Sequence, residues 1–362
     1  MHHRKNKVAV FLHSVRMEDW IISFIPQIFG FCYFFIYYFD GSFNTSILLH
    51  LLLFVVSSIG FAAFGYYIND FYDLEIDRKA GKKTVLGSLT KRQKRGLLFS
   101  SIICMFSPWI LLPANEYSIA LIVSEVVIFF LYSHPLFRLK ENWILSIIID
   151  SLYAYTIPFT LCLVTFSLYY QHTTDIYLLF ITATFFIAGC RNIIVHQLSD
   201  YDNDRKVGIQ LIPHVIGIKK TKSLVYFCMW IEVGLLFVIW LLYAYFFHWT
   251  YALFLLIIVL YSLIHLFKKT EKRLLFPNYY YQVLLPVTYA ILLISIDLQW
   301  IYFIIPYLII FHYNLLHWIT CRLRSVLSKI VNYSIYYFLL IFGINLKKEK
   351  KSVYNYLKRK RN

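Results

Sequence analysis

The chain has 362 residues, of which 60% are hydrophobic, 20% aromatic and only 15% charged. Soluble globular chains carry about 25% charged residues, so this composition excludes a soluble domain and predicts a protein that crosses a membrane several times. The net charge is +16, but the basic residues are spread over short connections rather than gathered in a basic module, so nucleic acid is not an expected partner.

The chain begins with a polar, basic segment, residues 1–19, for which we expect no cleavable signal peptide. Ten apolar stretches follow, each about long enough to cross a bilayer. They lie near residues 20–38, 46–66, 97–113, 117–133, 144–166, 175–194, 223–245, 250–267, 280–296 and 298–318. Pro286 and Pro306 interrupt the last two, which leaves a re-entrant or kinked element open as the alternative there.

The basic residues indicate how these spans are oriented. With the N-terminus inside and the ten spans numbered in order, all 35 Lys and Arg residues fall on one side. Cytoplasmic loops are rich in Lys and Arg, so we predict a multi-pass protein of the cell membrane with both termini in the cytoplasm. Six cysteines are scattered singly, so neither disulfides nor structural zinc are expected.

After the last span the chain becomes strongly basic. Residues 330–346 form an apolar, Tyr-rich stretch followed by several lysines. A helix lying on an anionic membrane surface is the predicted structure, because an eleventh span would move this charge outside. The predicted organisation is thus a cytoplasmic segment (1–19), a transmembrane domain (20–318) and a basic cytoplasmic tail (319–362).

Two aspartate-rich stretches follow the second and sixth apolar runs. In the first, Asn69, Asp73 and Asp77 are spaced by four and would share one face of a helix. In the second, Asp200 and Asp204 have the same spacing. Both stretches fall in predicted cytoplasmic connections, residues 67–96 and 191–222, so they can act together.

Carboxylates placed in this way suit a divalent cation. Mg²⁺ prefers oxygen ligands and often binds through one or two carboxylates plus substrate phosphates. Two such faces could therefore hold Mg²⁺ and a diphosphate, and the metal would neutralise the leaving group. The alternative is that the acidic residues are solvated helix ends, balanced by Arg78, Lys79, Arg205 and Lys206.

Several neighbouring residues are candidates for the same site. On a continuous helix, Asn192 and His196 would extend the face of Asp200 and Asp204. Arg191 lies beside this motif, and Lys82 in the first connection suits a diphosphate. His196 has an alternative as an interfacial histidine bonded to a neighbour.

Three carboxylates, Glu125, Asp150 and Glu232, fall within or near spans and need partners or a wet cavity. Asp150 is the best candidate of the three for a role near an acceptor.

The residues resemble a known family. Asn69 to Asp77 reads NDxxDxxxD, Asp200 to Asp204 reads DxxxD, and Tyr132 to Lys140 is similar to a YSxPxxRLK segment. These three motifs, in this order, are similar to those of the UbiA superfamily of intramembrane prenyltransferases, and the resemblance covers about residues 10–296.

The resemblance implies an all-α fold, a polytopic bundle of nine to ten transmembrane helices around a central cavity. It also implies Mg²⁺ as cofactor, held by Asn69, Asp73, Asp77, Asp200 and Asp204. Residues expected to carry the chemistry are Asp73, Asp77, Asp200, Asp204, Tyr132 and Lys140. Residues expected to contact substrate are Asn69, Asp70, Lys82, Arg16, Arg138, Arg191, Asn192 and His196.

The implied activity is transfer of a prenyl group from a polyprenyl diphosphate to a small-molecule acceptor, aromatic or other, with release of diphosphate. The expected partners are the prenyl diphosphate, the acceptor and the lipid bilayer. A membrane terpene cyclase of the same family is one alternative, and a non-catalytic lipid-binding or transport homologue is another. Most members have nine spans and an outside C-terminus, whereas the charges here favour ten spans and a cytoplasmic tail.

Overall fold

A computed structural model describes residues 21, 23–39, 41–79, 84–172, 176–246, 280–313 and 316. Within these residues every regular element is helical, which confirms the predicted all-α membrane fold. The chain divides into two compact units, Met1–Tyr302 and Phe303–Asn362, and the site described below belongs to the first. Arg16, Lys82, the predicted span 250–267 and the predicted tail 319–362 lie outside the described residues.

Among the described residues, five helices are long and apolar enough to cross a membrane: Thr45–Glu75, Glu116–Ser133, Leu145–Tyr170, Leu179–Ser199 and Ile218–Ile239. The same part of the chain has three shorter apolar helices, Phe24–Phe39, Tyr281–Ile296 and Leu298–Tyr313. These eight helices match eight of the ten predicted spans. Asp297 separates the last two of these helices along the chain, and Pro306 does not interrupt the helix that contains it.

The first unit begins with α3 (Phe24–Phe39) and α4 (Thr45–Lys79). With 35 residues, α4 is about 52 Å long at 1.5 Å per residue, well beyond the roughly 30 Å hydrocarbon core. Its C-terminal turns therefore extend past the apolar part of the helix. The first aspartate motif lies on these turns.

The segment that follows α4 returns through α5 (Val85–Ser88), α6 (Lys91–Phe106) and η1 (Ser107–Ile110). A capping box between Thr90 and Gln93 begins α6. Together α6 and η1 cover residues 97–110 of the predicted span at 97–113. Helix α6 approaches α4 closely where α4 carries small residues. The Ser57 hydroxyl of α4 donates to the Met105 carbonyl of α6 at 2.8 Å. A Cβ at Gly60 would lie 2.2 Å from the Met105 nitrogen, so only glycine permits this approach.

Next come α7 (Glu116–Ser133), η2 (Leu139–Glu141) and a helix that runs through α8 (Leu145–Ser151), η3 (Leu152–Thr156) and α9 (Ile157–Tyr170). The middle segment, η3, is π-helical. Single turns of this kind inside α-helices occur frequently at functional sites. The predicted span at 144–166 is thus one helix with a local change of winding.

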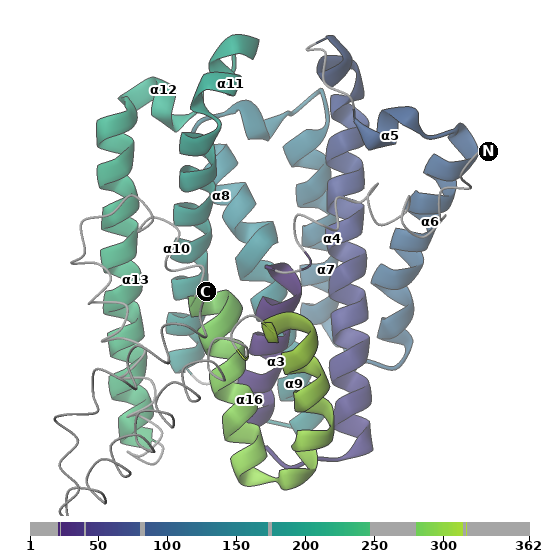
Figure 1. The fold of residues 1–362 in the computed structure, drawn as a ribbon, viewed down its shortest axis with the longest axis vertical. Coiled ribbons are helices and arrows are strands. Elements are labelled where there is room, and N and C mark those ends of the chain that lie inside the picture. Colours follow the sequence, from purple (N-terminus) through teal and green to yellow (C-terminus); the bar gives the residue numbers. More distant parts are fainter. Residues whose placement is uncertain are drawn as a thin grey trace, which may run out of the picture. The chain divides into compact units, whose positions relative to one another are not determined.

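The rest of the unit consists of α10 (Ile176–Ser199), α11 (Tyr201–Val207), α12 (Ile212–Ile216), α13 (Ile218–Phe246), η5 (Tyr280–Leu284), α16 (Leu285–Ile296) and η6 (Leu298–Trp300). Helix α10 packs against α13 and α8, and α16 packs against α3. The Trp300 indole donates to the Gly41 carbonyl at 2.8 Å, which ties the loop after α3 to the end of α16. Figure 1 shows the C-terminal end of α4 at the same end of the bundle as α11 and α12.

Candidate functional site

The first motif is helical, as its spacing predicts. Asn69 and Asp73 lie on α4, one turn apart, and the side chain of Asp73 is only 19% exposed. Asp70 and Asp77 lie on the same helix and are partly buried. The four-residue spacing therefore places Asn69, Asp73 and Asp77 on one face of the C-terminal end of α4.

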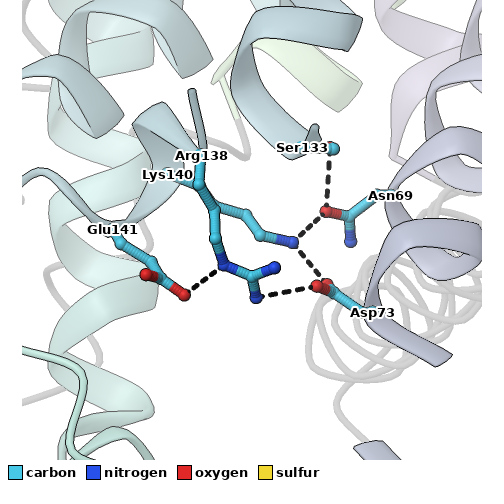
Figure 2. A network of polar contacts seen from close by, with 6 residues as sticks. All are labelled: Asn69, Asp73, Ser133, Arg138, Lys140 and Glu141. Carbon is cyan, nitrogen blue, oxygen red and sulfur yellow. Dashed lines mark hydrogen bonds and ion pairs between the residues drawn. The ribbon is translucent and has the colours of Figure 1, made fainter. Parts of the chain in front are cut away.

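Two basic residues of the connection between α7 and α8 contact this face (Figure 2). The Lys140 ammonium donates to Asn69 Oδ1 at 2.8 Å and also bonds Asp73 Oδ2. Arg138 Nη2 lies 3.2 Å from Asp73 Oδ1. Each carboxylate oxygen of Asp73 thus has a cationic partner from a segment about 65 residues further along the chain.

The connection is held in place by further contacts. Arg138 Nε also bonds the Glu141 carboxylate, and the Ser133 hydroxyl donates to Asn69 Oδ1 at 3.2 Å. Arg138 has φ +43° and ψ +49°, a left-handed conformation that is uncommon for a residue with a Cβ. Strained backbone of this kind persists where the surroundings determine it, and the two ion pairs of Arg138 supply that constraint.

Burial affects the charge of Lys140. Removal from water lowers the pKa of its ammonium below the ordinary lysine value, and the adjacent Asp73 carboxylate opposes this effect. The charged form of Lys140 is therefore disfavoured by burial and stabilised by the neighbouring Asp73 carboxylate.

Tyr132 connects the first motif to the interior of the bundle. It lies one residue before the end of α7, and its ring centroid is 5.3 Å from that of Tyr153. The Tyr153 hydroxyl in turn donates to Asp150 Oδ2 at 2.5 Å.

The second motif differs from the predicted continuous helix. Helix α10 ends at Ser199 and α11 begins at Tyr201, so Asp200 occupies a bend. Main-chain bonds still join Asp200 N to His196 O at 3.0 Å and Asp204 N to Asp200 O at 2.9 Å. The helix expected to continue from Asn192 to Asp204 is therefore interrupted at Asp200, a residue type that favours helix ends and turns over helix interiors.

At this bend, His196 Nδ1 lies 3.0 Å from Asp200 Oδ2, with side-chain exposures of 69% and 41%. His196 therefore pairs with a neighbouring residue, which agrees with the alternative of a histidine at the membrane interface bonded to a neighbour. Asn192 is partly buried two turns before the bend on α10. Asp204 is partly buried on α11, and stacking of Tyr201 on His214 connects α11 to α12.

The donor chemistry fits Mg²⁺. Asn69, Asp73, Asp77, Asp200 and Asp204 offer only oxygen atoms. In the part of the chain that the structure describes, no three His, Cys, Asp or Glu side chains gather as a complete cation site. Because Mg²⁺ usually completes its coordination with water and substrate phosphates, motifs that each supply one or two oxygens suit it.

Comparison with known proteins identifies the family of this chain. The sequence model of the UbiA prenyltransferase family matches residues 24–284, which include all three motifs. The chain belongs to the UbiA prenyltransferase family. Among curated proteins, sequence comparison finds no significant match.

Solved structures of UbiA homologues have the same fold. A homologue from Archaeoglobus fulgidus bound to GPP and Mg²⁺ is 20% identical and has a TM-score of 0.58, with 78% of this chain and 99% of that chain covered. The same homologue bound to DMAPP and Mg²⁺ is 19% identical, again with a TM-score of 0.58, and 78% and 98% are covered. A digeranylgeranylglyceryl phosphate synthase is 19% identical with a TM-score of 0.52, and 81% and 96% are covered.

Arg191 of this UbiA family member lies inside the bundle. It is fully buried, and its Nε lies 2.7 Å from Glu232 Oε1 on α13. The side chain therefore does not extend toward the membrane surface, and Glu232 has the partner that a carboxylate within a span requires.

Sequence reasoning missed three residues that contribute to this arrangement: Ser133, Glu141 and Tyr153. Ser133 lies within the YSxPxxRLK-like segment, and Glu141 follows that segment directly. The motif could therefore have pointed to both residues. Tyr153 stands three residues after Asp150 within the same span. That spacing was a usable signal, because residues three apart meet on a helix surface.

Proposed function

We propose that this UbiA family member transfers a prenyl group from a prenyl diphosphate to a small-molecule acceptor, with Mg²⁺ as cofactor. The observation that carries the proposal is the convergence of Asn69 and Asp73 of α4 with Lys140 and Arg138 of the following connection. Oxygen ligands for a metal and cations for a diphosphate thus lie side by side. The ligands named for the A. fulgidus homologue, GPP or DMAPP with Mg²⁺, support this assignment.

In this proposal the metal is held by Asn69, Asp73, Asp77, Asp200 and Asp204. When bound, Mg²⁺ would supply Lewis-acid stabilisation of the departing diphosphate. Lys140 and Arg138 would bind diphosphate oxygens by charge-assisted hydrogen bonds, which are stronger than neutral ones. Because both side chains are about 15% exposed, their charges would act with little screening by water.

The remaining assignments concern residues around this centre. Tyr132 would lie next to the reacting end of the prenyl chain, between Asp73 and the apolar interior. Asp70, Lys82, Arg16, Arg191, Asn192 and His196 remain proposed substrate contacts. We also propose that the motif-bearing end of the bundle is cytoplasmic, on the charge distribution of the sequence.

The test uses purified full-length protein with Mg²⁺ and three donors: DMAPP, GPP and a longer prenyl diphosphate. Diphosphate release is followed with and without added acceptors, and products are identified by mass spectrometry. Mg²⁺-dependent release that gives a prenylated acceptor supports transfer. Release without acceptor that gives a cyclic product would identify a cyclase, and no release from any donor would refute the proposal.

A further inference from the structure

One carboxylate near the site has no place in the metal–diphosphate centre. Asp150 lies in the last turn of α8, five residues into the apolar span from its loop end, roughly 7 Å deeper than the connection. It is partly buried and accepts a hydrogen bond from Tyr153. Among the described residues, no lysine or arginine forms an ion pair with it. A carboxylate at this depth faces the bundle interior rather than lipid.

Asp150 lies between the segment that carries Tyr132 and the helix that leads to Asp200. On one side, the ring of Tyr153, whose hydroxyl donates to Asp150, lies 5.3 Å from that of Tyr132 at the end of α7. On the other side, α8 packs against α10, on which Gln197 donates to Ser146 of α8 and the neighbouring His196 pairs with Asp200 at 3.0 Å. The carboxylate therefore lies near the end of α7, which leads into the YSxPxxRLK-like segment, and near α10, which leads to Asp200, on the membrane side of the proposed diphosphate centre.

Close packing between α8 and α10 fixes this position. The Ser151 hydroxyl donates to the Phe186 carbonyl, and Gln197 Nε2 donates to Ser146 Oγ at 3.1 Å. A Cβ at Gly189 would lie 2.5 Å from Ser151 Oγ, so the two helices touch beside Asp150. The π-helical segment η3 follows directly and carries Tyr153. The carboxylate is thus held on a rigid support.

We propose that Asp150 binds the hydroxyl group of an uncharged acceptor and disfavours acceptors that carry a carboxylate. This inference rests on the proposed function. Tyr153 occupies Oδ2, and an ionised carboxylate can accept about four hydrogen bonds, so capacity remains for a hydroxyl donor. An acceptor carboxylate close to Asp150 would be repelled, since like charges interact more strongly away from bulk water.

The test compares pairs of acceptors of similar size, in which one member is uncharged and the other carries a carboxylate. Full-length protein with Mg²⁺ and GPP is given 4-hydroxybenzamide or 4-hydroxybenzoate, and in a second pair glycerol or glycerate. Wild type should prefer the uncharged member by about tenfold or more in kcat/KM. Asp150→Asn keeps the size and an acceptor oxygen but removes the charge, so the preference should fall below about threefold. The ratio is measured within one variant, so a general loss of activity cancels.

Glu125→Gln is the matched control, because Glu125 is a buried carboxylate of another span and should keep the wild-type ratio. An unchanged ratio in Asp150→Asn, or equal use of both members by wild type, would overturn the proposal. So would wild-type protein that releases diphosphate from GPP but neither prenylates nor binds either uncharged probe. Absence of Mg²⁺-dependent diphosphate release would instead refute the proposed function itself.

Discussion

The Lys140 ammonium donates a hydrogen bond to Asn69 Oδ1 at 2.8 Å and also bonds the Asp73 carboxylate. One cation from the α7–α8 connection therefore joins two residues that lie one turn apart on α4. This contact links the first motif to the YSxPxxRLK-like segment, and it leads to the first prediction.

Lys140→Met should lower kcat/KM for Mg²⁺-dependent diphosphate release by about 100-fold, the scale of losing one electrostatic contact to a developing charge. Lys140→Arg keeps the charge and should retain more activity than Met. The measurement is diphosphate release from GPP. Lys91→Met, on an exposed lysine at the start of α6, is the control, and equal activity of Lys140→Met and wild type would contradict a diphosphate contact.

Asp73→Asn and Asp204→Asn should each reduce turnover by about 100- to 1,000-fold, because the amide carries no charge to hold Mg²⁺. Gel filtration in detergent should show that both variants remain folded. Asp202→Asn serves as the control, since Asp202 is exposed on α11 and should keep its activity. Wild-type turnover in either test variant would contradict the two-motif site.

The lowered pKa of Lys140 predicts early loss of its proton as pH rises. In metal-free protein, the amine should become reactive toward acetylation with a midpoint below the ordinary lysine value of about 10.4. Between the two pKa values the folded state binds fewer protons than the unfolded state, so this residue's contribution to the free energy of unfolding rises with pH there. Mass spectrometry of the Lys140 peptide across pH gives the midpoint, and a value at or above 10.4 would contradict the prediction.

Gly60→Ala should weaken the packing of α4 on α6. Its new Cβ would lie 2.2 Å from the Met105 nitrogen, and overpacking of this kind costs about 1–3 kcal/mol. Thermal unfolding in detergent is the measurement. Gly96→Ala, on α6 with open space within 4 Å of the position that a Cβ would take, should be neutral or stabilising by about 0.5–1 kcal/mol, and equal behaviour of the two variants would show that the close approach is unimportant.

Arg191→Met and Glu232→Leu should each destabilise the protein by about 3–5 kcal/mol, because each leaves one partner of a buried pair uncompensated. The double variant Arg191→Met with Glu232→Leu should recover most of this loss. Denaturant unfolding of the three proteins tests the pairing. Additive losses in the double variant would mean that the two side chains do not stabilise each other.

Much of the fold followed from local pattern. Eight predicted spans correspond to observed helices, because an apolar run about 20 residues long has few other ways to satisfy its main chain in lipid. Asn69 and Asp73 were likewise predicted on one helix face, since helical spacing follows directly from the order of residues. The bend at Asp200 was not predicted, because the same four-residue spacing occurs on a continuous helix and across a junction.

The sequence by itself determined the class of protein, the helical position of the first motif and the family resemblance. Only the tertiary structure decided which distant residues meet: Lys140 with Asp73, Arg191 with Glu232, and Tyr132 with Tyr153. The physical reason is the distance along the chain over which each interaction acts. Hydrophobic runs and helical periodicity act over neighbouring residues, whereas ion pairs between helices depend on how closely those helices pack, which small residues such as Gly60 and Gly189 allow.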